Sequence, residues 1–188
     1  MTKRLGLVVI AVLAVAGFGG TALGAGPSVT LKAGFFFPSD KLFRETYSGG
    51  PSFGADIAVP LGGVFQLWAG GEFFGKAGLL SLSEETTKVR IVPLYAGLRA
   101  QFGSKGVRPY LGAAAAYFFL HEENPLGTAD DGGLGLLSQA GVQFRLNGAF
   151  GLDIFVAYRA CTVRSGGSDP LEAKLGGFSA GLGLAYRF

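Results

Sequence analysis

Charge and cysteine are both scarce in this chain. Only 15% of its 188 residues are Asp, Glu, Lys or Arg, and Cys161 is the single cysteine. A lone cysteine excludes a framework of intrachain disulfides, so we expect a free thiol packed among other side chains. The low charge and a mean hydropathy of +0.41 are unusual for a soluble globular domain.

Motifs for several kinds of chemistry are also missing. The sequence contains no GxxxxGK[ST] phosphate loop, no HExxH pair and no CxxC pair, so it offers no support for nucleotide or zinc chemistry. We therefore predict no cofactor and no metal site. The basic residues form no stripe or cluster, which argues against a nucleic-acid partner.

The N-terminus has the organisation of a secretory signal peptide. Lys3 and Arg4 form a basic start, residues 5–18 form an apolar run, and small residues follow it. An uncleaved membrane anchor is the alternative, but the apolar run is shorter than the ~20 residues of a membrane-spanning helix. No cysteine directly follows the run, which argues against a lipoprotein anchor.

The chain is thereby divided into a signal peptide at residues 1–25 and a mature domain at residues 26–188. Without Lys3 and Arg4 the formal net charge falls from +3 to +1, so most of the apparent basicity belongs to the signal. No second run of about 20 apolar residues follows, which excludes membrane-spanning helices in the mature domain.

Alternation with a period of two is what the mature domain has instead. In its last segment, apolar side chains occupy every second position from Phe178 to Phe188, and small or charged residues such as Arg187 lie between them. This pattern predicts a β-strand with two unlike faces. The fifth segment is ambiguous, because residues 113–116 are all alanine. The eight alternating segments are residues 29–35, 53–59, 65–73, 92–102, 107–120, 139–146, 150–159 and 178–188.

Alternation alone leaves two folds open. In a soluble carrier of the lipocalin type the apolar face points inward, whereas in a membrane barrel it points outward. The connections favour the membrane barrel, because short links alternate with long ones. Asn147 and Gly148 are also a preferred pair for a two-residue type I′ hairpin turn. The short links are residues 61–63, 103–106 and 147–148, and the long links are residues 38–51, 75–88, 121–133 and 164–175.

The sequence therefore predicts an all-β protein, an eight-stranded antiparallel transmembrane β-barrel with short periplasmic turns and long extracellular loops. Hydrocarbon cannot hydrogen-bond the backbone, so a sheet survives in a membrane only if it closes and leaves no edge. Aromatic residues are expected where the strands meet lipid headgroups. The expected belts are Phe102, Phe144, Phe150, Tyr186 and Phe188 on the periplasmic side, and Phe35, Phe73, Tyr158 and Phe178 on the outer side.

The C-terminus resembles a known signal. Tyr186 and Phe188, with apolar residues at every second position before them, resemble the C-terminal signal of Gram-negative outer-membrane proteins, which the barrel assembly machinery reads. From the strand, loop, strand pattern of residues 32–61, through VPLYAGLR at residues 92–99, to its end, the mature chain is similar to small outer-membrane barrels of the OmpX, OmpW and OmpA-barrel type. The resemblance implies export through the periplasm, a monomer in the outer membrane, and contact with outer-membrane lipid and lipopolysaccharide.

An eight-stranded barrel is only wide enough for its own side chains. Charges confined there should pair, because an unpaired buried charge is costly, so we predict a lumen mostly plugged by paired charges. A narrow water path between inward glycines and alanines is the alternative, and it would have a weak anion preference. The predicted charge network is Lys32, Asp56, Glu72, Arg99, Arg145, Asp153, Arg159 and Arg187, with Gln66, Trp68, Tyr95, Gln101, Gln139 and Gln143 beside it.

Catalysis finds little support in the sequence. Some eight-stranded outer-membrane barrels modify lipid A or phospholipid with a histidine, a serine and an acid, as the resemblance implies. Here His121 is the only histidine, Glu122 and Glu123 follow it, and Ser138 is the candidate nucleophile across the hairpin. The chain lacks the His-x-Ser of the deacylase type and the first-loop histidine of the palmitoyltransferase type. We therefore predict a solvated histidine and no enzyme.

The acidic residues of the third long link leave one more alternative open. Glu122 with Glu123, and Asp130 with Asp131, suggest as an alternative a site for a divalent cation or for cation-bridged lipopolysaccharide phosphates, although we favour simple solvation of exposed loops. The predicted function is an integral outer-membrane barrel with a structural or surface-interaction role. A narrow porin-like channel is the first alternative, and an enzyme that modifies lipid A or phospholipid is the second.

Overall fold

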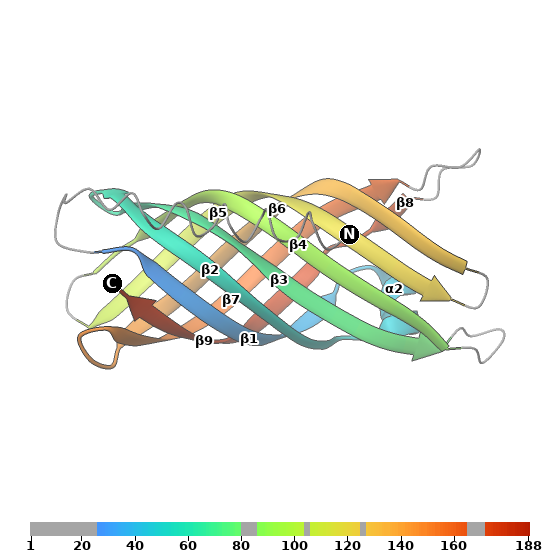
Figure 1. Ribbon diagram of the computed structural model, residues 1–188, viewed down its shortest axis with the longest axis horizontal. Coiled ribbons are helices and arrows are strands. Elements are labelled where there is room, and N and C mark those ends of the chain that lie inside the picture. Colours follow the sequence, from blue (N-terminus) through green and yellow to red (C-terminus); the bar gives the residue numbers. More distant parts are fainter. Residues whose placement is uncertain (1–25, 80–85, 104–105, 125–126, 165–171) are drawn as a thin grey trace.

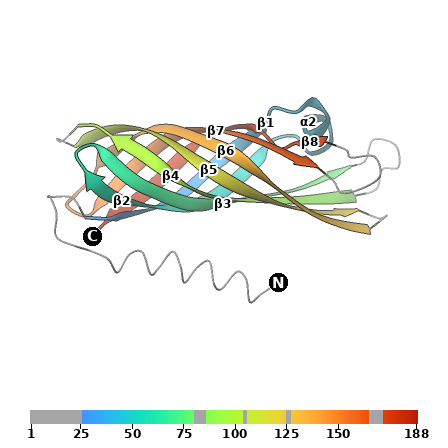
Figure 2. The ribbon, with the colours of Figure 1, turned by 90° about the horizontal axis from the view of Figure 1, so that it is seen from above.

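The protein is a closed, elongated β-barrel. Its computed structural model describes residues 26–79, 86–103, 106–124, 127–164 and 172–188, so the predicted signal peptide at residues 1–25 lies outside the described residues. Eight antiparallel strands follow one another around the cylinder, and the last pairs with the first. The strands are tilted to the long axis (Figures 1 and 2). The predicted all-β, eight-stranded antiparallel barrel is confirmed.

All eight alternating segments of the sequence form barrel strands. One short helix, α2 (Lys41–Tyr47), lies between the first two strands, and a three-residue strand, β8 (Glu172–Lys174), pairs with the end of the seventh. Among the described residues, no helix is long and apolar enough to cross a membrane. The barrel strands are β1 (Ser28–Pro38), β2 (Gly50–Gly62), β3 (Phe65–Leu79), β4 (Thr86–Gln101), β5 (Val107–Asn124), β6 (Gly127–Arg145), β7 (Phe150–Arg164) and β9 (Gly177–Arg187).

The barrel closes where β9 pairs with β1. Their register runs from Ser28 opposite Arg187 to Pro38 opposite Gly177, and the other edge of β9 pairs with β7. The N–H of Phe188 donates to the carbonyl oxygen of Pro27 at 3.0 Å, which continues the seam to the end of β9. Strand β9 therefore has a partner on both sides, as a sheet requires in hydrocarbon.

The two ends of the barrel differ in their connections. The end that holds the β2–β3, β4–β5 and β6–β7 links, together with the end of β9, is called the turn end here. The opposite end, which holds α2 and β8, is called the loop end (Figure 2). At the turn end, Gly62 and Gly63 have φ angles of 124° and 58°, which residues with a Cβ rarely adopt.

The β6–β7 link differs from the predicted turn. Strand β6 ends at Arg145 and β7 begins at Phe150, and neither Asn147 nor Gly148 has a positive φ, so the predicted type I′ turn is wrong. Instead, Oδ1 of Asn147 accepts hydrogen bonds from the N–H groups of Ala149 and Phe150, at 3.0 and 2.8 Å. The asparagine side chain organises this turn by bonding its own backbone.

The two faces of the strands are distributed as a membrane barrel requires. Leu182 in β9 and Ile154 in β7 point outward and are 54% and 46% exposed, whereas Arg99 in β4 points inward and is 1% exposed. The ambiguous alanines of β5 are also resolved, because Ala114 and Ala116 are buried. The apolar faces point outward, which excludes the soluble carrier as an alternative fold.

Exposed aromatic pairs lie near both ends of this outer surface. At the turn end, the rings of Phe150 and Tyr186 stand 5.2 Å apart between centroids. Nearer the loop end, Tyr158 and Phe178 stand 4.8 Å apart. Each pair joins β7 to β9 directly across the ladder, so the aromatic residues of the predicted belts also contribute cross-strand contacts.

Two of the four long links predicted from the sequence consist mostly of strand. Strands β3 and β4 stay paired as far as Leu79 opposite Thr86, and β5 and β6 as far as Asn124 opposite Gly127. The prediction of loops at residues 75–88 and 121–133 is therefore wrong over most of their length. The remaining residues, 80–85 and 125–126, lie outside the described residues.

Strands β3 to β6 consequently extend the barrel wall at the loop end (Figure 1). The neighbouring ladders stop earlier, because β2–β3 pairing ends at Ser52 opposite Phe74 and β6–β7 pairing at Gly135 opposite Cys161. The first long link, between β1 and β2, folds into α2, whose N-cap residue Asp40 accepts a hydrogen bond from the N–H of Phe43 at 3.0 Å. The fourth contains β8.

The preference of the two faces inverts in this extension. In β4, Lys88 and Arg90 point outward and are exposed, and Val89 and Ile91 between and beside them are buried inside. A wall surrounded by lipid needs apolar side chains outside, whereas a wall surrounded by water buries them inside. A prediction that requires an apolar outer face therefore ends these strands too early, because the outer face of the extension is polar.

A charge placed on the outward face at the middle of β9 should destabilise the barrel. Leu182→Arg brings a guanidinium into hydrocarbon and should lower the free energy of unfolding by about 2–4 kcal/mol. Leu146→Arg, at the turn end, is the matched control and should cost about 1 kcal/mol or less. Urea unfolding of the protein in lipid vesicles measures both. Equal losses for the two variants would contradict a lipid-facing outer surface.

Candidate functional site

Inward side chains divide the lumen into three zones along the barrel axis. The middle holds buried charges, the loop end holds apolar side chains, and the turn end holds arginines. The charged zone is Lys32, Asp56, Glu72, Arg99, Asp153 and Arg159, all buried. The apolar zone is Phe36, Tyr47, Phe74, Val89, Ile91, Phe118, Leu137, Cys161 and Leu175. The arginine pocket is lined by Arg108, Arg145 and Arg187.

One buried ion pair joins Lys32 of β1 to Asp56 of β2, and both side chains are at most 2% exposed. The Lys32 ammonium also donates to Oε1 of Gln139 on β6 at 2.8 Å and lies 5.0 Å from the ring centroid of Phe155 on β7. Asp56 accepts from Nε1 of Trp68 at 3.0 Å. These contacts join side chains of non-adjacent strands across the lumen. The buried charges of Lys32 and Asp56 therefore compensate each other in the absence of water.

A second buried pair spans the full width of the barrel. Arg159 of β7 pairs with Glu72 of β3, and these strands stand four positions apart in the ring of eight. Arg159 also donates to Oγ of Ser179 at 2.5 Å, and its guanidinium carbon lies 4.6 Å from the ring centroid of Phe36. The pair therefore lies where the charged zone meets the apolar zone.

Arg99 and Asp153 are held by neutral side chains. Nε of Arg99 donates to Oε1 of Gln66 at 2.9 Å, and the guanidinium lies 4.7 Å from the ring of Tyr110. The Tyr110 hydroxyl donates to Oδ2 of Asp153 at 3.1 Å and accepts from Nε2 of Gln139 at 2.6 Å. Both terminal nitrogens of Arg99 have no hydrogen-bond partner among the described protein atoms. Arg99 is thus a buried cation with two spare donor groups.

Small residues make room for these long side chains. A Cβ on Gly112 would stand 3.0 Å from the Trp68 ring, and a Cβ on Gly70 would stand 2.8 Å from the Tyr95 hydroxyl. Both contacts are closer than ordinary van der Waals packing allows. At these two positions, lumen side chains therefore occupy the space that the inward glycines were predicted to leave.

Two residues of the predicted charge network lie apart from it. Arg145 is exposed and Arg187 is half-buried, both at the turn end, and no ion pair within the described ranges includes either. They occupy the last inward positions of β6 and β9, where the strands leave the membrane and water can solvate charge. Arg108 of β5 joins them. Sequence reasoning missed Arg108 because the alternation of β5 was ambiguous.

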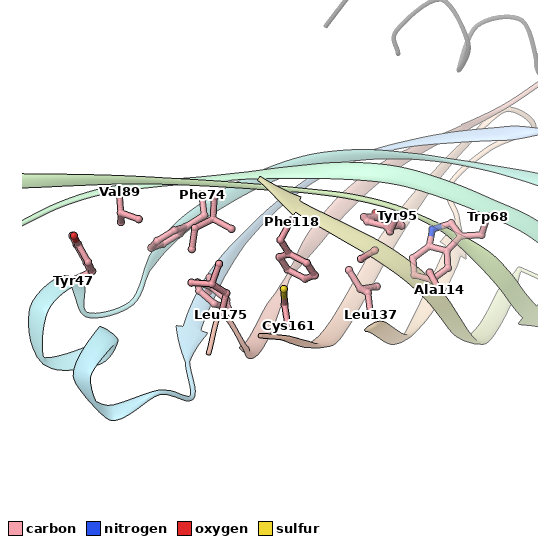
Figure 3. Packing of buried hydrophobic residues seen from close by; sticks show 13 residues of the cluster. Tyr47, Trp68, Phe74, Val89, Tyr95, Ala114, Phe118, Leu137, Cys161 and Leu175 are labelled. Atoms are coloured by element: carbon pink, nitrogen blue, oxygen red, sulfur yellow. The ribbon is translucent and has the colours of Figure 1, made fainter. Parts of the chain in front are cut away.

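The apolar zone was also missed by sequence reasoning, which assumed a polar interior along the whole barrel. Figure 3 shows the buried hydrophobic cluster that contains this zone, with side chains along the lumen from Tyr47 to Trp68. Phe74 and Phe118 are completely buried, and Phe74 packs edge-on against Phe36 at 5.1 Å between centroids. The sequence signal that could have predicted this zone was the pair of apolar residues at inward positions of β4, Val89 and Ile91.

Helix α2 covers this zone from the loop end. Phe43 and Tyr47 of the helix contact the cluster, with their rings 4.9 Å apart. The Tyr47 hydroxyl donates to Oε1 of Glu122 on β5 at 2.9 Å and lies 3.0 Å from the hydroxyl of Thr87 on β4. One tyrosine thus ties the helix to the extended wall, and its ring closes the apolar zone.

The candidate catalytic group of the sequence is not assembled. His121 faces Asp130 across the β5–β6 ladder, with Nδ1 and Oδ1 2.6 Å apart. Ser138 stands opposite Ala113, which places it roughly 27 Å along the sheet from His121 at about 3.4 Å per residue. In the part of the chain that the structure describes, no group of three or more His, Cys, Asp or Glu is arranged to hold a metal ion.

Solved structures of similar shape include barrels of outer-membrane and surface proteins. Neisserial surface protein A aligns with a TM-score of 0.60 and 17% identity, and the N-terminal β-barrel domain of Pseudomonas aeruginosa OprF with 0.57 and 15%. A major outer membrane protein of Thermus thermophilus aligns with 0.54 and 16%. Each alignment covers 88% of this chain and 100% of the other.

The fold is that of a small outer-membrane β-barrel. No protein-family model and no curated protein sequence matches the chain, so the likeness is one of architecture at low identity. It agrees with the fold resemblance drawn from the alternation and the C-terminal residues. In this small outer-membrane barrel, Tyr186 and Phe188 are exposed on the outward face, with their rings 5.0 Å apart.

Breaking the buried pair across the barrel should be costly. Glu72→Ala leaves the Arg159 guanidinium buried without its carboxylate and should lower the free energy of unfolding by about 3–5 kcal/mol. The double variant Glu72→Leu with Arg159→Leu removes both charges and should recover most of that loss. Glu45→Ala, which breaks the exposed Lys41–Glu45 pair, should have no measurable effect. A single Glu72 variant as stable as the double variant would refute the compensation of Arg159 by Glu72.

The docking of α2 should weaken in alkali. Burial raises the pKa of Tyr47 to about 12, with a further rise from the charge of Glu122, against the opposing hydrogen bond with Thr87. Because the docked tyrosine holds its proton more tightly than a solvated one, its contribution is complete below pH ~10 and falls as the pH rises further. The tyrosinate absorbance of wild type minus that of Tyr47→Phe should titrate near pH 12. A midpoint near the ordinary value of about 10 would argue against the buried position.

Proposed function

We propose that the protein is an integral outer-membrane barrel with a closed lumen and a structural or surface-interaction role. It resides in the outer membrane, acts as a monomer and contacts outer-membrane lipid and lipopolysaccharide through its apolar outer surface. The turn end faces the periplasm, and α2 with the extended wall faces the cell exterior. The exposed Tyr186 and Phe188 serve as the signal for the barrel assembly machinery.

The observation that carries this proposal is the filling of the lumen by two successive zones. In the charged zone, the Glu72–Arg159 pair reaches from one wall to the opposite wall. In the apolar zone beyond it, Phe74 and Phe118 are 0% exposed. An ion would have to break a buried salt bridge and then cross an apolar layer, both of which are unfavourable.

The role at the cell surface is supported by the shape of the loop end. Strands β3 to β6 project beyond the rest of the barrel, and their outward face carries polar residues such as Lys88, Arg90 and Glu123. The separation of His121 from Ser138 argues against this pair as a site of lipid modification. We therefore favour a non-enzymatic role over a lipid-modifying enzyme.

Conductance separates the closed barrel from the narrow channel. Purified protein inserted in planar bilayers should give no steady current. Phe74→Ala with Phe118→Ala removes two fully buried rings that block the apolar zone and should raise the frequency of open events, because the layer that separates the charged zone from the loop end becomes thinner. Phe73→Ala with Phe119→Ala changes the outward neighbours and is the matched control, which should remain closed. A reproducible open channel in the wild type would overturn the closed lumen and favour the porin-like alternative.

A further inference from the structure

We propose that the arginine pocket at the turn end binds a phosphate group. The pocket lies at the mouth of the lumen and has a cavity volume of about 30 Å³. Arg108, Arg145 and Arg187 line it together with Gln143 and Ser28. Such a site goes beyond the closed-barrel role, because it opens toward the aqueous side and needs no path through the lumen.

The strand register brings these residues together around one side of the mouth. Arg108 of β5 stands opposite Gln143 of β6, and Arg145 follows two residues later on the same face. Arg187 of β9 stands opposite Ser28 of β1. Backbone hydrogen bonds fix the positions of Arg145 and Arg187. The N–H of Arg145 donates to the carbonyl oxygen of Gly106 at 2.7 Å, and the N–H of Arg187 donates to the carbonyl oxygen of Ala149 at 2.8 Å.

The floor of the pocket is made of small residues. Gly151 of β7 stands opposite Arg145 of β6 on one side and opposite Ala185 of β9 on the other. Arg187 follows Ala185 by two residues on the same face of β9, and all of these residues line the pocket. Ala185 contributes only a methyl group, and Gly151 contributes none. This leaves open space between the three cationic side chains.

The charge of the pocket is uncompensated by its own lining. Among the described residues, three arginines and no Asp or Glu line it, whereas Asp56 and Asp153 of the charged zone are engaged deeper in the barrel with Lys32 and Tyr110. An arginine is always charged and offers a planar fork of donors that matches phosphate oxygens. A group with more than one negative charge balances three guanidiniums better than a single carboxylate does.

Buried donors without a partner point to the same ligand. Gln143 is 5% exposed, its Oε1 accepts from Gln101 at 2.9 Å, and its Nε2 has no partner among the described protein atoms. Nε of Arg108 is also buried and unpartnered. A buried donor left unsatisfied is costly. A phosphate in the pocket supplies the acceptor oxygens that both donors lack.

Two sources supply this chemistry at the mouth of a membrane barrel, a soluble phosphate and the phosphate of a lipid headgroup. The arginine side chains of the pocket lie at inward positions of their strands rather than on the lipid-facing side, which favours the soluble anion. Calorimetric titration of the barrel in nanodiscs distinguishes them. Inorganic phosphate is titrated into nanodiscs of phosphatidylcholine and, separately, into nanodiscs containing phosphatidylglycerol. Equal affinity in both supports the soluble source, and weaker phosphate binding beside phosphatidylglycerol supports the headgroup.

Variants test the residues of the pocket in phosphatidylcholine nanodiscs. Wild type should bind one phosphate saturably, and acetate should bind at least tenfold more weakly because it carries a single charge. Arg145→Gln with Arg187→Gln should weaken phosphate binding about tenfold or more, since it removes two charge-assisted hydrogen-bond donors. Ala185→Glu, which brings a carboxylate into the pocket, should abolish binding. Arg44→Gln, on the exposed face of α2 at the opposite end, is the matched control and should leave binding unchanged.

Refolding from denaturant directly into nanodiscs keeps these variants independent of the assembly machinery, and circular dichroism verifies that each contains the barrel. The proposal is overturned if folded wild type shows no saturable phosphate binding. It is equally overturned if Arg44→Gln weakens binding as much as the double arginine variant, or if Ala185→Glu binds as wild type does. Conductance plays no part in these readouts, so a failure here is distinct from a failure of the closed-lumen proposal.

Discussion

Backbone hydrogen bonding in the absence of water is the constraint on which this structure depends. A membrane interior offers no partner for a free N–H or C=O, so a sheet placed there must close. The pairing of β9 with both β1 and β7 achieves this closure. Once the ring is closed with eight strands, the width of the lumen is set, and only side chains fit inside it. The burial of lumen charge is therefore a consequence of closure.

The surroundings of the wall change along the barrel, and the preference of its faces changes with them. Where lipid surrounds the strands, leucines such as Leu182 face outward and arginines such as Arg99 face inward. Beyond the membrane, β4 turns Lys88 and Arg90 outward and Val89 inward. The barrel thus has the residue pattern of a membrane protein in its middle, and its extended wall of β3 to β6 has that of a water-soluble sheet. This inversion explains why a charged zone and an apolar zone occupy one continuous lumen.

Charge follows the same gradient of water access. In the middle, Lys32 and Arg159 are each paired with a carboxylate, and Arg99 is held by neutral side chains, because an uncompensated buried charge is costly. At the turn end, Arg145 and Arg187 have no carboxylate in their pocket, because water reaches the mouth and lowers the cost of leaving them unpaired. The excess of inward basic residues over acidic ones therefore gathers at one opening.

The sequence by itself determined the strand number, the antiparallel order and the outward face, because lipid imposes a period of two that survives in the residue order. It also identified Lys32, Asp56, Glu72, Arg99, Asp153 and Arg159 as inward residues. The partners of those charges were decided only by the tertiary structure, since Glu72 and Arg159 meet across the ring from strands far apart in the chain. The tertiary structure likewise decided the extended wall, the place of Arg108 in the pocket and the docking of Tyr47. The physical reason is that side-chain alternation shows on which face of a strand a residue lies, but does not show whether lipid or water surrounds that face.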